Sequence, residues 1–331
     1  MSLIKGQKAR KPDLYPWAFK LQRSLQHSIW SDEEFTFQSD KQQFFTEMNE
    51  EQREIITRCL ALIGQVEVAV KRFWAEVGKW YRHDSIASLG LVCAFTEVVH
   101  SQAYSRLLEV MEMDDKFNEI LKEKVVSDRF EYLTKHTEKQ FTETQKQRLY
   151  ALILFTLFVE NVSLFTQFYV INYFDRSFNW LKDTTTQISY TIHEEDLHAK
   201  FGISLINTLR EENPELFDDE LMKVIEKEVN DAYKHECRIV EWVLGEFDHS
   251  YEDGSGNSVL NVDAMKYFIA ERLNSSMEEI GMPFQISIDK DYSKEVKWFN
   301  ERHKLVKKTD TFAKTSTAYL KHGEDYDNEE L

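Results

Sequence analysis

One apolar run constrains the fold more than any other feature of this sequence. The run, LYALILFTLFVENVSLFTQFYVINYF, extends from Leu149 to Phe174, and Glu160 is its only charged residue. A helix of this length is long enough to cross a bilayer, for which about 20 apolar residues suffice. A helix that is apolar on every side is equally typical of the centre of a large helical bundle. The rest of the sequence decides between a membrane helix and a core helix.

Composition favours the core helix. The chain of 331 residues has a mean hydropathy of −0.51, and the apolar run lacks flanking loops with a one-sided excess of Lys and Arg. It has only ten glycines and four prolines, too few for the many turns of a β or α/β domain. We therefore predict an all-α protein with a few long helices and no membrane span. Aromatic residues, 13% of the chain, would fill its thick core.

Charge and cysteine usage exclude several partners and compartments. The formal net charge of −17 argues against a nucleic-acid surface, because phosphate binding needs clustered Lys and Arg. Cys59, Cys93 and Cys237 are far apart and form no CxxC pattern, which favours reduced structural thiols. The first 17 residues contain no apolar segment of the kind found in secretion signals. We therefore expect a cytoplasmic protein.

Helical spacing of apolar residues divides the chain into a helical domain, residues 1–307, and a flexible, acidic C-terminal tail, residues 308–331. Within the domain, Asn49 precedes two acidic residues and a long apolar period, which is a typical helix start. The stretch EDGSGNS, residues 252–258, is expected to be a loop. The helices expected from this pattern cover residues 50–81, 85–113, 114–136, 142–174, 180–213, 215–247 and 261–281.

Glu160 needs a partner, because an ionised carboxylate alone in hydrocarbon is too costly to persist. No Lys or Arg lies within one helical turn of it. Two Glu-x-x-His pairs on apolar helices offer partners through a shared cation: Glu97 with His100, and Glu195 with His198. Spacing of i and i+3 places both side chains of a pair on one helix face, where they can bind a single metal ion.

Glu67 is a second lone carboxylate in an apolar helix, so four helices each contribute ligands. The order of Glu67, the first pair, Glu160 and the second pair is the known ligand pattern of ferritin-like di-iron and di-manganese carboxylate bundles. Carboxylates with one imidazole per metal suit iron or manganese better than structural zinc. A third pair, Glu246 with His249, borders the expected loop and is interpreted as a surface feature. We predict a ferritin-like bundle with two metal ions per chain, since a metal-free bundle would leave Glu160 unexplained.

The motifs resemble those of the small (β, radical-generating) subunit of class I ribonucleotide reductase, from about residue 15 to the C-terminus. TEVVHSQAY is similar to the family pattern ExxHSxxY, which makes Tyr104 the counterpart of the radical-bearing tyrosine. An acidic residue precedes the second pair in the family, and here it is Glu194. QRSLQHSIWSDEEF resembles the segment that carries the radical-transfer tryptophan, which would be Trp30. STAYLKHG resembles the segment with the relay tyrosine of the tail, Tyr319, with Tyr326 as the alternative.

The resemblance implies a division of labour between two subunits. The β subunit makes and stores an oxidant at its two metals and passes it to a separate α subunit, which reduces ribonucleotides to deoxyribonucleotides. The tail would bind α, and family members are typically homodimers. No nucleotide site is expected in this chain. A ferritin-like di-metal oxidase or oxygenase would share the ligands but would need a substrate pocket and no α-binding tail, and an iron store would need neither Trp30 nor the tail.

Two departures from the family pattern concern the metals. Glu67 and Glu194 stand where most members have Asp, and Lys71 lies one turn after Glu67, where a cation would favour ionised ligands. Glu at the first position occurs in subclasses that rely on manganese, and Tyr104 contradicts the manganese/iron subclass, which has Phe there. The combination resembles the dimanganese subclass, activated by superoxide, with the oxidant on the metals and Tyr104 only hydrogen-bonded. Iron, dioxygen and a tyrosyl radical on Tyr104 stay open as alternatives.

Overall fold

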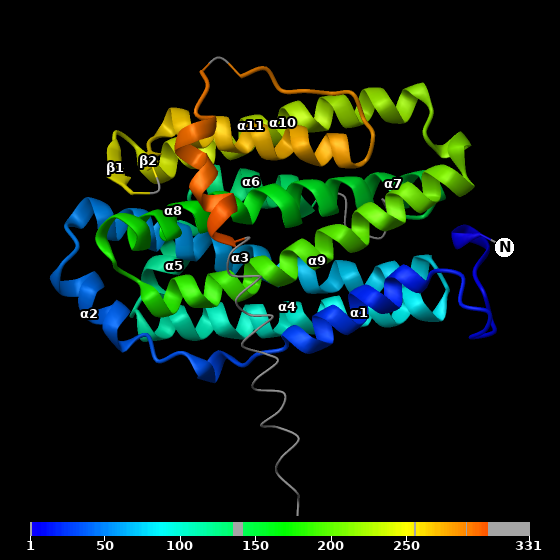
Figure 1. Ribbon diagram of the computed structural model, residues 1–331, viewed down its shortest axis with the longest axis horizontal. Coiled ribbons are helices and arrows are strands. Elements are labelled where there is room, and N and C mark those ends of the chain that lie inside the picture. The colour runs from blue at the N-terminus through cyan, green and yellow to red at the C-terminus, as the bar shows by residue number, and fades with distance from the viewer. Residues whose placement is uncertain (1, 135–141, 255, 289, 304–331) are drawn as a thin grey trace, which may run out of the picture.

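The computed structural model of this protein describes residues 2–134, 142–254, 256–288 and 290–303, apart from the side chains of residues 67–70. These residues are mostly helical, which confirms the predicted all-α class, and one short hairpin is added to the helices (Figure 1). The principal helices are α1 (Pro16–Ser28), α2 (Gln38–Thr46), α3 (Glu50–Trp80), α4 (Asp84–Val110), α5 (Asp114–Ile120), α6 (Lys124–Thr134), α7 (Gln145–Leu154), α8 (Leu164–Phe178), α9 (Lys182–Glu212), α10 (Asp219–Leu244) and α11 (Val262–Glu279). The shorter elements are the 3-10 turns η1 (Leu3–Lys5), η2 (Asp32–Glu34) and η5 (Pro214–Leu216), the π-helix η4 (Phe155–Ser163), the strands β1 (His249–Asp253) and β2 (Gly256–Leu260), and a helix over residues 293–303.

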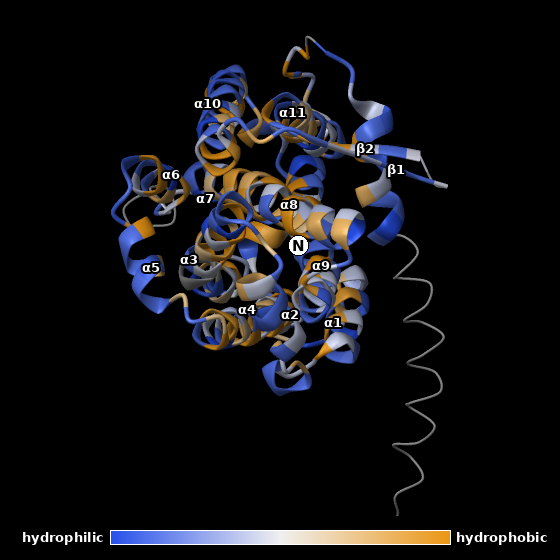
Figure 2. Cartoon of the chain, turned by 90° about the vertical axis from the view of Figure 1, so that its left-hand side faces the viewer, coloured by the Kyte–Doolittle hydropathy of each residue, from blue (hydrophilic) through white to orange (hydrophobic). Residues whose placement is uncertain are grey.

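Four long segments form the centre of the molecule. α3, α4, α9 and the continuous line α7–η4–α8 run along the long axis (Figure 1), and apolar residues gather between them in the end-on view (Figure 2). α10 and α11 pack against each other and cover one side of this bundle, where α11 contacts η4, while α1 packs on α4 and α9. The result is a ferritin-like bundle in which four segments can direct side chains to one interior point.

Side-chain caps determine where the core helices begin. Asn49 Oδ1 accepts the backbone N–H of Gln52 at 2.9 Å, and Gln52 Oε1 accepts the backbone N–H of Asn49 at 3.0 Å, so α3 starts where the sequence predicts. α9 is capped from outside, because buried Asp40 of α2 accepts both the backbone N–H and the hydroxyl of Thr184, each at 2.7 Å. These bonds satisfy N–H groups that have no partner inside their own helix, and they fix the start of two helices that carry the site.

The apolar run lies in the core of the bundle. By length and composition two helical stretches could cross a membrane, Asp84–Val110 and Gln145–Phe178, and 89% of the most apolar window of the second is buried. This burial confirms the predicted core helix. The corresponding window of α4 is only 44% buried, so α4 turns part of its apolar surface outward.

Between α7 and α8 the core segment adopts the π-helix η4, which carries Glu160. Such insertions are rare and frequently lie at functional sites. α9 approaches η4 so closely that a Cβ atom on Gly202 would lie 2.0 Å from Thr156 Oγ1. Glycine is therefore needed at this crossing, which brings the ligand-bearing faces of α9 and η4 together.

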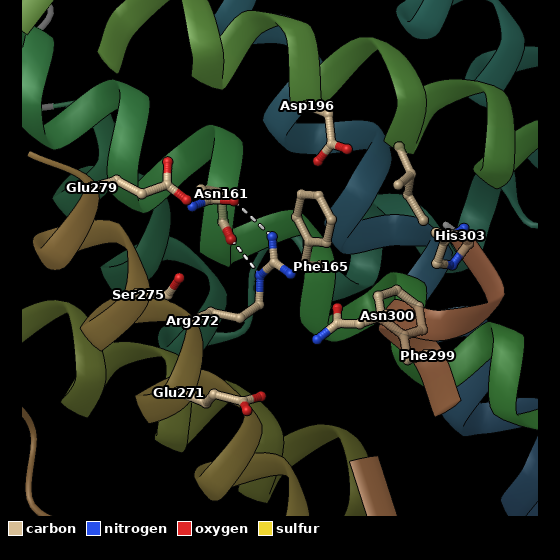
Figure 3. Close-up of a pocket in the computed structure, with 11 residues that line it drawn as sticks. Asn161, Phe165, Asp196, Glu271, Arg272, Ser275, Glu279, Phe299, Asn300 and His303 are labelled. Atoms are coloured by element: carbon tan, nitrogen blue, oxygen red, sulfur yellow. Dashed lines mark hydrogen bonds between the residues drawn. The ribbon is translucent and has the colours of Figure 1, made fainter. Parts of the chain in front are cut away.

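Two arginines bind the backbone of this π-helix. Arg129 of α6 donates from Nη2 to the Ser163 carbonyl at 2.7 Å, and Arg272 of α11 donates from Nε to the Asn161 carbonyl at 2.5 Å (Figure 3). Arg272 Nη2 also bonds to Asn161 Oδ1 at 2.7 Å. Helices outside the central four thus hold the segment on which Glu160 lies.

Several expectations about elements need correction. The single helix predicted over residues 114–136 is two helices, α5 and α6, separated at residues 121–123; the amphipathic period continues across the break and so conceals it. The loop predicted at 252–258 belongs to a hairpin in which Asp253 pairs with Gly256. The helices α1, α2 and 293–303 were not expected, although Pro16 is a favourable first residue for α1. The predicted tail, residues 308–331, lies outside the described residues.

Candidate metal centre

Three elements bring four ligand-type side chains to one interior point. Glu97 from α4, Glu160 from η4, and Glu195 and His198 from α9 each place one ligand atom within 4.8 Å of the others. All four side chains are fully buried. Three carboxylates and an imidazole without access to solvent form a donor set that suits a cation with oxygen and nitrogen ligands.

His100 joins this group and gives it a two-sided arrangement. Its Nδ1 lies 3.2 Å from Glu97 Oε2 and 3.3 Å from Glu195 Oε1. On the other side, His198 Nδ1 lies 2.8 Å from Glu97 Oε1 and 3.0 Å from Glu195 Oε2. The structure thus brings together the two Glu-x-x-His pairs singled out in the sequence. The two imidazoles therefore share the same two carboxylates, one imidazole on each side.

The charge balance of this group calls for a cation. Burial and the charges of Glu195 and Glu97 raise the pKa of Glu160 well above its ordinary value. Burial also opposes ionisation of Glu97 and Glu195, but the interactions of these two with His100 and His198 outweigh it and lower the pKa of both. For His198, burial lowers the pKa, yet the surrounding groups raise it well above its ordinary value. Glu160 and His198 therefore hold protons that a metal ion would displace on binding.

A hydrogen-bonded line connects His100 with Trp30. His100 Nε2 lies 2.7 Å from Glu194 Oε2, and the same oxygen accepts the Trp30 Nε1–H at 3.0 Å. Ser28 donates its hydroxyl to the other oxygen of Glu194 at 2.8 Å. The Trp30 ring also stacks on the His100 ring, with centroids 6.2 Å apart. Trp30 and Glu194, which the sequence resemblance singled out separately, are in direct contact here.

Thr96 bonds to His198 on the side of the imidazole ring that faces away from Glu97 and Glu195. Its Oγ1 lies 2.8 Å from His198 Nε2, and its own hydroxyl hydrogen is donated to the Cys93 carbonyl at 2.8 Å. Because that hydrogen is committed, Thr96 accepts a hydrogen from Nε2, which leaves Nδ1 as the nitrogen that can bind a metal. Nδ1 lies beside Glu97 and Glu195, which accept its hydrogen here, and loss of that hydrogen would leave the Nδ1 lone pair on the same side as the two carboxylates.

Glu160 has one oxygen bound and one without a donor. Trp74 of α3 donates from Nε1 to Glu160 Oε1 at 2.7 Å. No N–H or hydroxyl group of the described residues donates to Oε2, although this atom is buried. When Glu160 is ionised, as a metal ligand must be, Oε2 is a buried charged acceptor without a donor, which costs more than about 1–3 kcal/mol. A cation beside Oε2 would remove that cost, so the residues present fit a metal centre.

The remaining predicted residues lie around this centre or outside the described part of the chain. Lys71 of α3 donates to Ser101 Oγ at 3.3 Å, which places its ammonium beside the residue that follows His100. Tyr104 is buried in α4, and its hydroxyl donates to Thr191 Oγ1 at 3.2 Å. Predicted positions that lie outside the described residues or side chains are Glu67, Tyr319 and Tyr326.

Sequence reasoning missed three residues that bond to the site: Ser28, Trp74 and Thr96. One signal was present for Trp74, which lies seven residues after Glu67 and therefore on the same face of α3. Thr96 directly precedes Glu97, but its hydroxyl meets a histidine 102 residues away. Nothing in the sequence distinguishes Ser28 from other serines.

Paired Glu-x-x-His helices around buried carboxylates define a di-metal carboxylate protein of the ferritin-like class. The chain belongs to the family described as "Ribonucleotide reductase, small chain", which matches residues 10–290. It is similar to the ribonucleoside-diphosphate reductase subunit beta of Halalkalibacterium halodurans. The two are 22% identical over 326 residues, which cover 96% of this chain and 90% of the relative.

Solved structures share the fold. The ribonucleotide reductase R2 subunit from Clostridium botulinum has a TM-score of 0.78 at 18% identity, over 92% of this chain and 94% of that one. The dimanganese(II)-NrdF of Streptococcus sanguinis has a TM-score of 0.66 at 15% identity, over 83% and 91% of the two chains. An R2-like ligand-binding oxidase with a Mn/Fe cofactor has a TM-score of 0.67 at 16% identity, over 83% and 97%. Family and donor set together support a di-metal site in this chain.

Removing a ligand should remove metal without unfolding the bundle. We expect Glu160→Ala and His198→Ala to hold well below two metal ions per chain, measured by elemental analysis, with nearly unchanged helix content by circular dichroism. The reason is that each change deletes a donor but leaves the helix packing in place. Glu246→Ala, which alters the exposed glutamate of the third Glu-x-x-His pair, is the matched control and should keep its metals. Full occupancy in either ligand variant would contradict the assignment.

Proposed function

We propose that this chain builds an oxidant at a pair of metal ions and passes it to a separate large subunit, which uses it to reduce ribonucleoside diphosphates to deoxyribonucleotides. Family membership implies the large subunit as partner. The observation that carries the proposal is the continuous line from His100 through Glu194 to Trp30. Storing metal does not require a hydrogen-bonded series that leads from a ligand to a tryptophan, whereas passing an oxidising equivalent to another subunit does.

In this proposal the line moves an electron and a proton together. An indole that loses an electron becomes far more acidic, and Glu194 Oε2 lies 3.0 Å from Trp30 Nε1, where it can accept the proton. Bonds from Ser28 and His100 keep the Glu194 oxygens oriented. The metal pair supplies the one-electron oxidising power. Its assigned ligands are Glu67, Glu97, His100, Glu160, Glu195 and His198.

Manganese is the proposed metal, with superoxide as the activating oxidant. Support comes from Glu67, where most family members have Asp, and from Lys71, whose ammonium bonds to the residue after His100. A cation at this position favours ionised carboxylates nearby. Iron activated by dioxygen is the alternative.

An oxidase of the same fold would need a pocket for its substrate. A cavity of about 420 Å³ does lie beside η4 and α9, reached by Asn161 and Asp196, which directly follow Glu160 and Glu195 (Figure 3). Arg272 and acidic side chains contribute to its lining, which does not suit an apolar substrate. This cavity therefore does not favour the oxidase over the reductase subunit.

A homodimer is the proposed assembly, formed through the outward face of α4. Leu91, Phe95 and Val98 lie on one stripe of this helix at 63%, 48% and 38% exposure. Large apolar side chains that gather on one exposed face mark interaction surfaces. A second copy of the same chain would bury this stripe against itself, as a two-fold interface requires.

Tyr104 is proposed as a hydrogen-bonded core tyrosine, with the oxidant stored on the metals. Tyr104→Phe should then retain appreciable deoxynucleotide formation, because it removes a hydroxyl that bonds to Thr191 but leaves the ring that fills the core. Electron paramagnetic resonance of the active wild-type protein should show manganese hyperfine structure and no tyrosyl signal. A stable tyrosyl signal that disappears in Tyr104→Phe together with all activity would assign the radical to this residue instead.

If the relay is correct, variants of its residues should keep their metal ions but lose turnover. Trp30→Phe and Tyr319→Phe should each keep the metals and the oxidant but lose deoxynucleotide formation with the large subunit, because Phe cannot pass on a proton-coupled electron. Product formation and metal content are measured on the same samples. Tyr326→Phe is the matched control and should stay active. An active Tyr319→Phe beside an inactive Tyr326→Phe would assign the tail relay to Tyr326. An active Trp30→Phe would contradict the proposed relay from His100 through Glu194 to Trp30.

If the chain dimerises through α4, introducing charged residues on its exposed apolar stripe should separate the two subunits. Leu91→Asp combined with Phe95→Asp should give monomers by sedimentation velocity, because burying two carboxylates in an apolar interface is unfavourable. Val224→Asp, at an exposed apolar position of α10, is the matched control and should remain dimeric. A double variant that sediments as a dimer would place the interface elsewhere.

A further inference from the structure

A second tryptophan contacts the metal centre independently of Trp30. Trp74 is fully buried, and its Nε1 donates directly to Glu160 Oε1 at 2.7 Å. Its ring also lies against the ring of His198, with centroids 5.8 Å apart. Trp74 therefore touches two assigned ligands, yet the relay through Trp30 does not use it.

Aromatic rings continue from Trp74 toward the surface, where Trp17 is half-buried and Tyr15 is 5% exposed. Phe201 of α9 stacks on Trp74 with ring centroids 5.1 Å apart, and its ring lies 6.2 Å from that of Trp17 on α1. Trp17 is half-buried and contacts Tyr15 edge-on at 6.4 Å. The Tyr15 hydroxyl donates to Glu212 Oε1 at 2.9 Å, so a carboxylate stands ready to take its proton.

We propose that Trp74, Trp17 and Tyr15 form a second electron path, which discharges an oxidised metal centre that no large subunit has used. Electrons move inward along it from a one-electron reductant in solution, such as ascorbate. The inference rests on the proposed function, because it needs an oxidising centre. A centre that oxidises Trp30 is also suited to oxidise Trp74, since each is an indole whose N–H is bonded to a carboxylate.

Each step balances in electrons and protons. Trp74 gives one electron to the metal centre and its indole proton to Glu160 Oε1. Trp17 then gives one electron to Trp74, which recovers its proton from Glu160. Tyr15 gives one electron to Trp17 and its phenolic proton to Glu212, and the reductant then supplies one electron to Tyr15 while Glu212 returns the proton. The net change is one electron moved from the reductant to the centre.

The second path ends away from the relay. Trp17 lies in the first turn of α1, whereas Trp30 follows the last residue of that helix, Ser28. A helix of 13 residues is about 20 Å long at 1.5 Å per residue. The outer end of the path can therefore be changed by mutation without altering the line from Trp30 to His100.

The test follows the loss of the oxidised centre in metal-loaded protein kept with ascorbate and without a large subunit. Its electron paramagnetic resonance signal is recorded over time. We expect Trp17→Phe to slow the loss several-fold relative to wild type, because Phe is not oxidised in place of Trp. Elemental analysis checks that the variant keeps its metals. Trp242→Phe, a half-buried tryptophan on α10 that packs on Arg58, is the matched control and should decay like wild type.

A second measurement maps where the oxidation goes. When the reductant is omitted, peptide mass spectrometry should find more oxidised product at Trp17 and Tyr15 than at Trp242. A wild-type rate of loss in Trp17→Phe, or equal oxidation at Trp17 and Trp242, would overturn the path. If the wild type forms no oxidised centre, the proposed function itself has failed, so the two failures are distinguishable.

Discussion

Three carboxylates that share one dry interior determine what the rest of the structure must provide. Glu97, Glu160 and Glu195 are each fully buried, and an ionised carboxylate without compensation costs several kcal/mol in such a place. His100 and His198 supply part of the compensation, and metal ions are suited to supply the rest. Because water is excluded, every charge and hydrogen bond at this point acts more strongly than it would at the surface. The surrounding helices maintain that exclusion.

The polar atoms that face away from the centre are also bound. Glu194 bonds to His100, Thr96 bonds to His198, and Trp74 bonds to one oxygen of Glu160. Such outer partners fix the tautomers and orientations of the groups that bind metal, and their loss typically weakens metal binding or activity. Two of the contacts around the ligands end in indoles, at Trp30 and Trp74. The same bonds that hold the ligands therefore also determine where an oxidising equivalent can leave.

Much of this centre could be predicted because its evidence is local in the chain. A lone Glu160 in an apolar run and two repeated Glu-x-x-His spacings need no knowledge of the fold. The hydrogen-bond partners could not be predicted in the same way: Trp74 meets a residue 86 positions away, and many tryptophans and threonines fit equally well before the helices are placed. The π-helix was also hidden, because the run around Glu160 is apolar on every side and shows no period that could distinguish a π-helix from an α-helix. The break between α5 and α6 escaped because both helices keep one amphipathic period.

The core line α7–η4–α8 has a consequence for the chain before it folds. Until the bundle has folded, residues 149–174 are not yet buried, and a stretch of this length and hydropathy is what membrane-insertion machinery selects. A charged residue at the centre of such a stretch opposes insertion by about 2.5–3.5 kcal/mol. Glu160 stands near the middle of the run. The carboxylate assigned to a metal in the folded protein thus also weighs against misdirection of the nascent chain into a membrane.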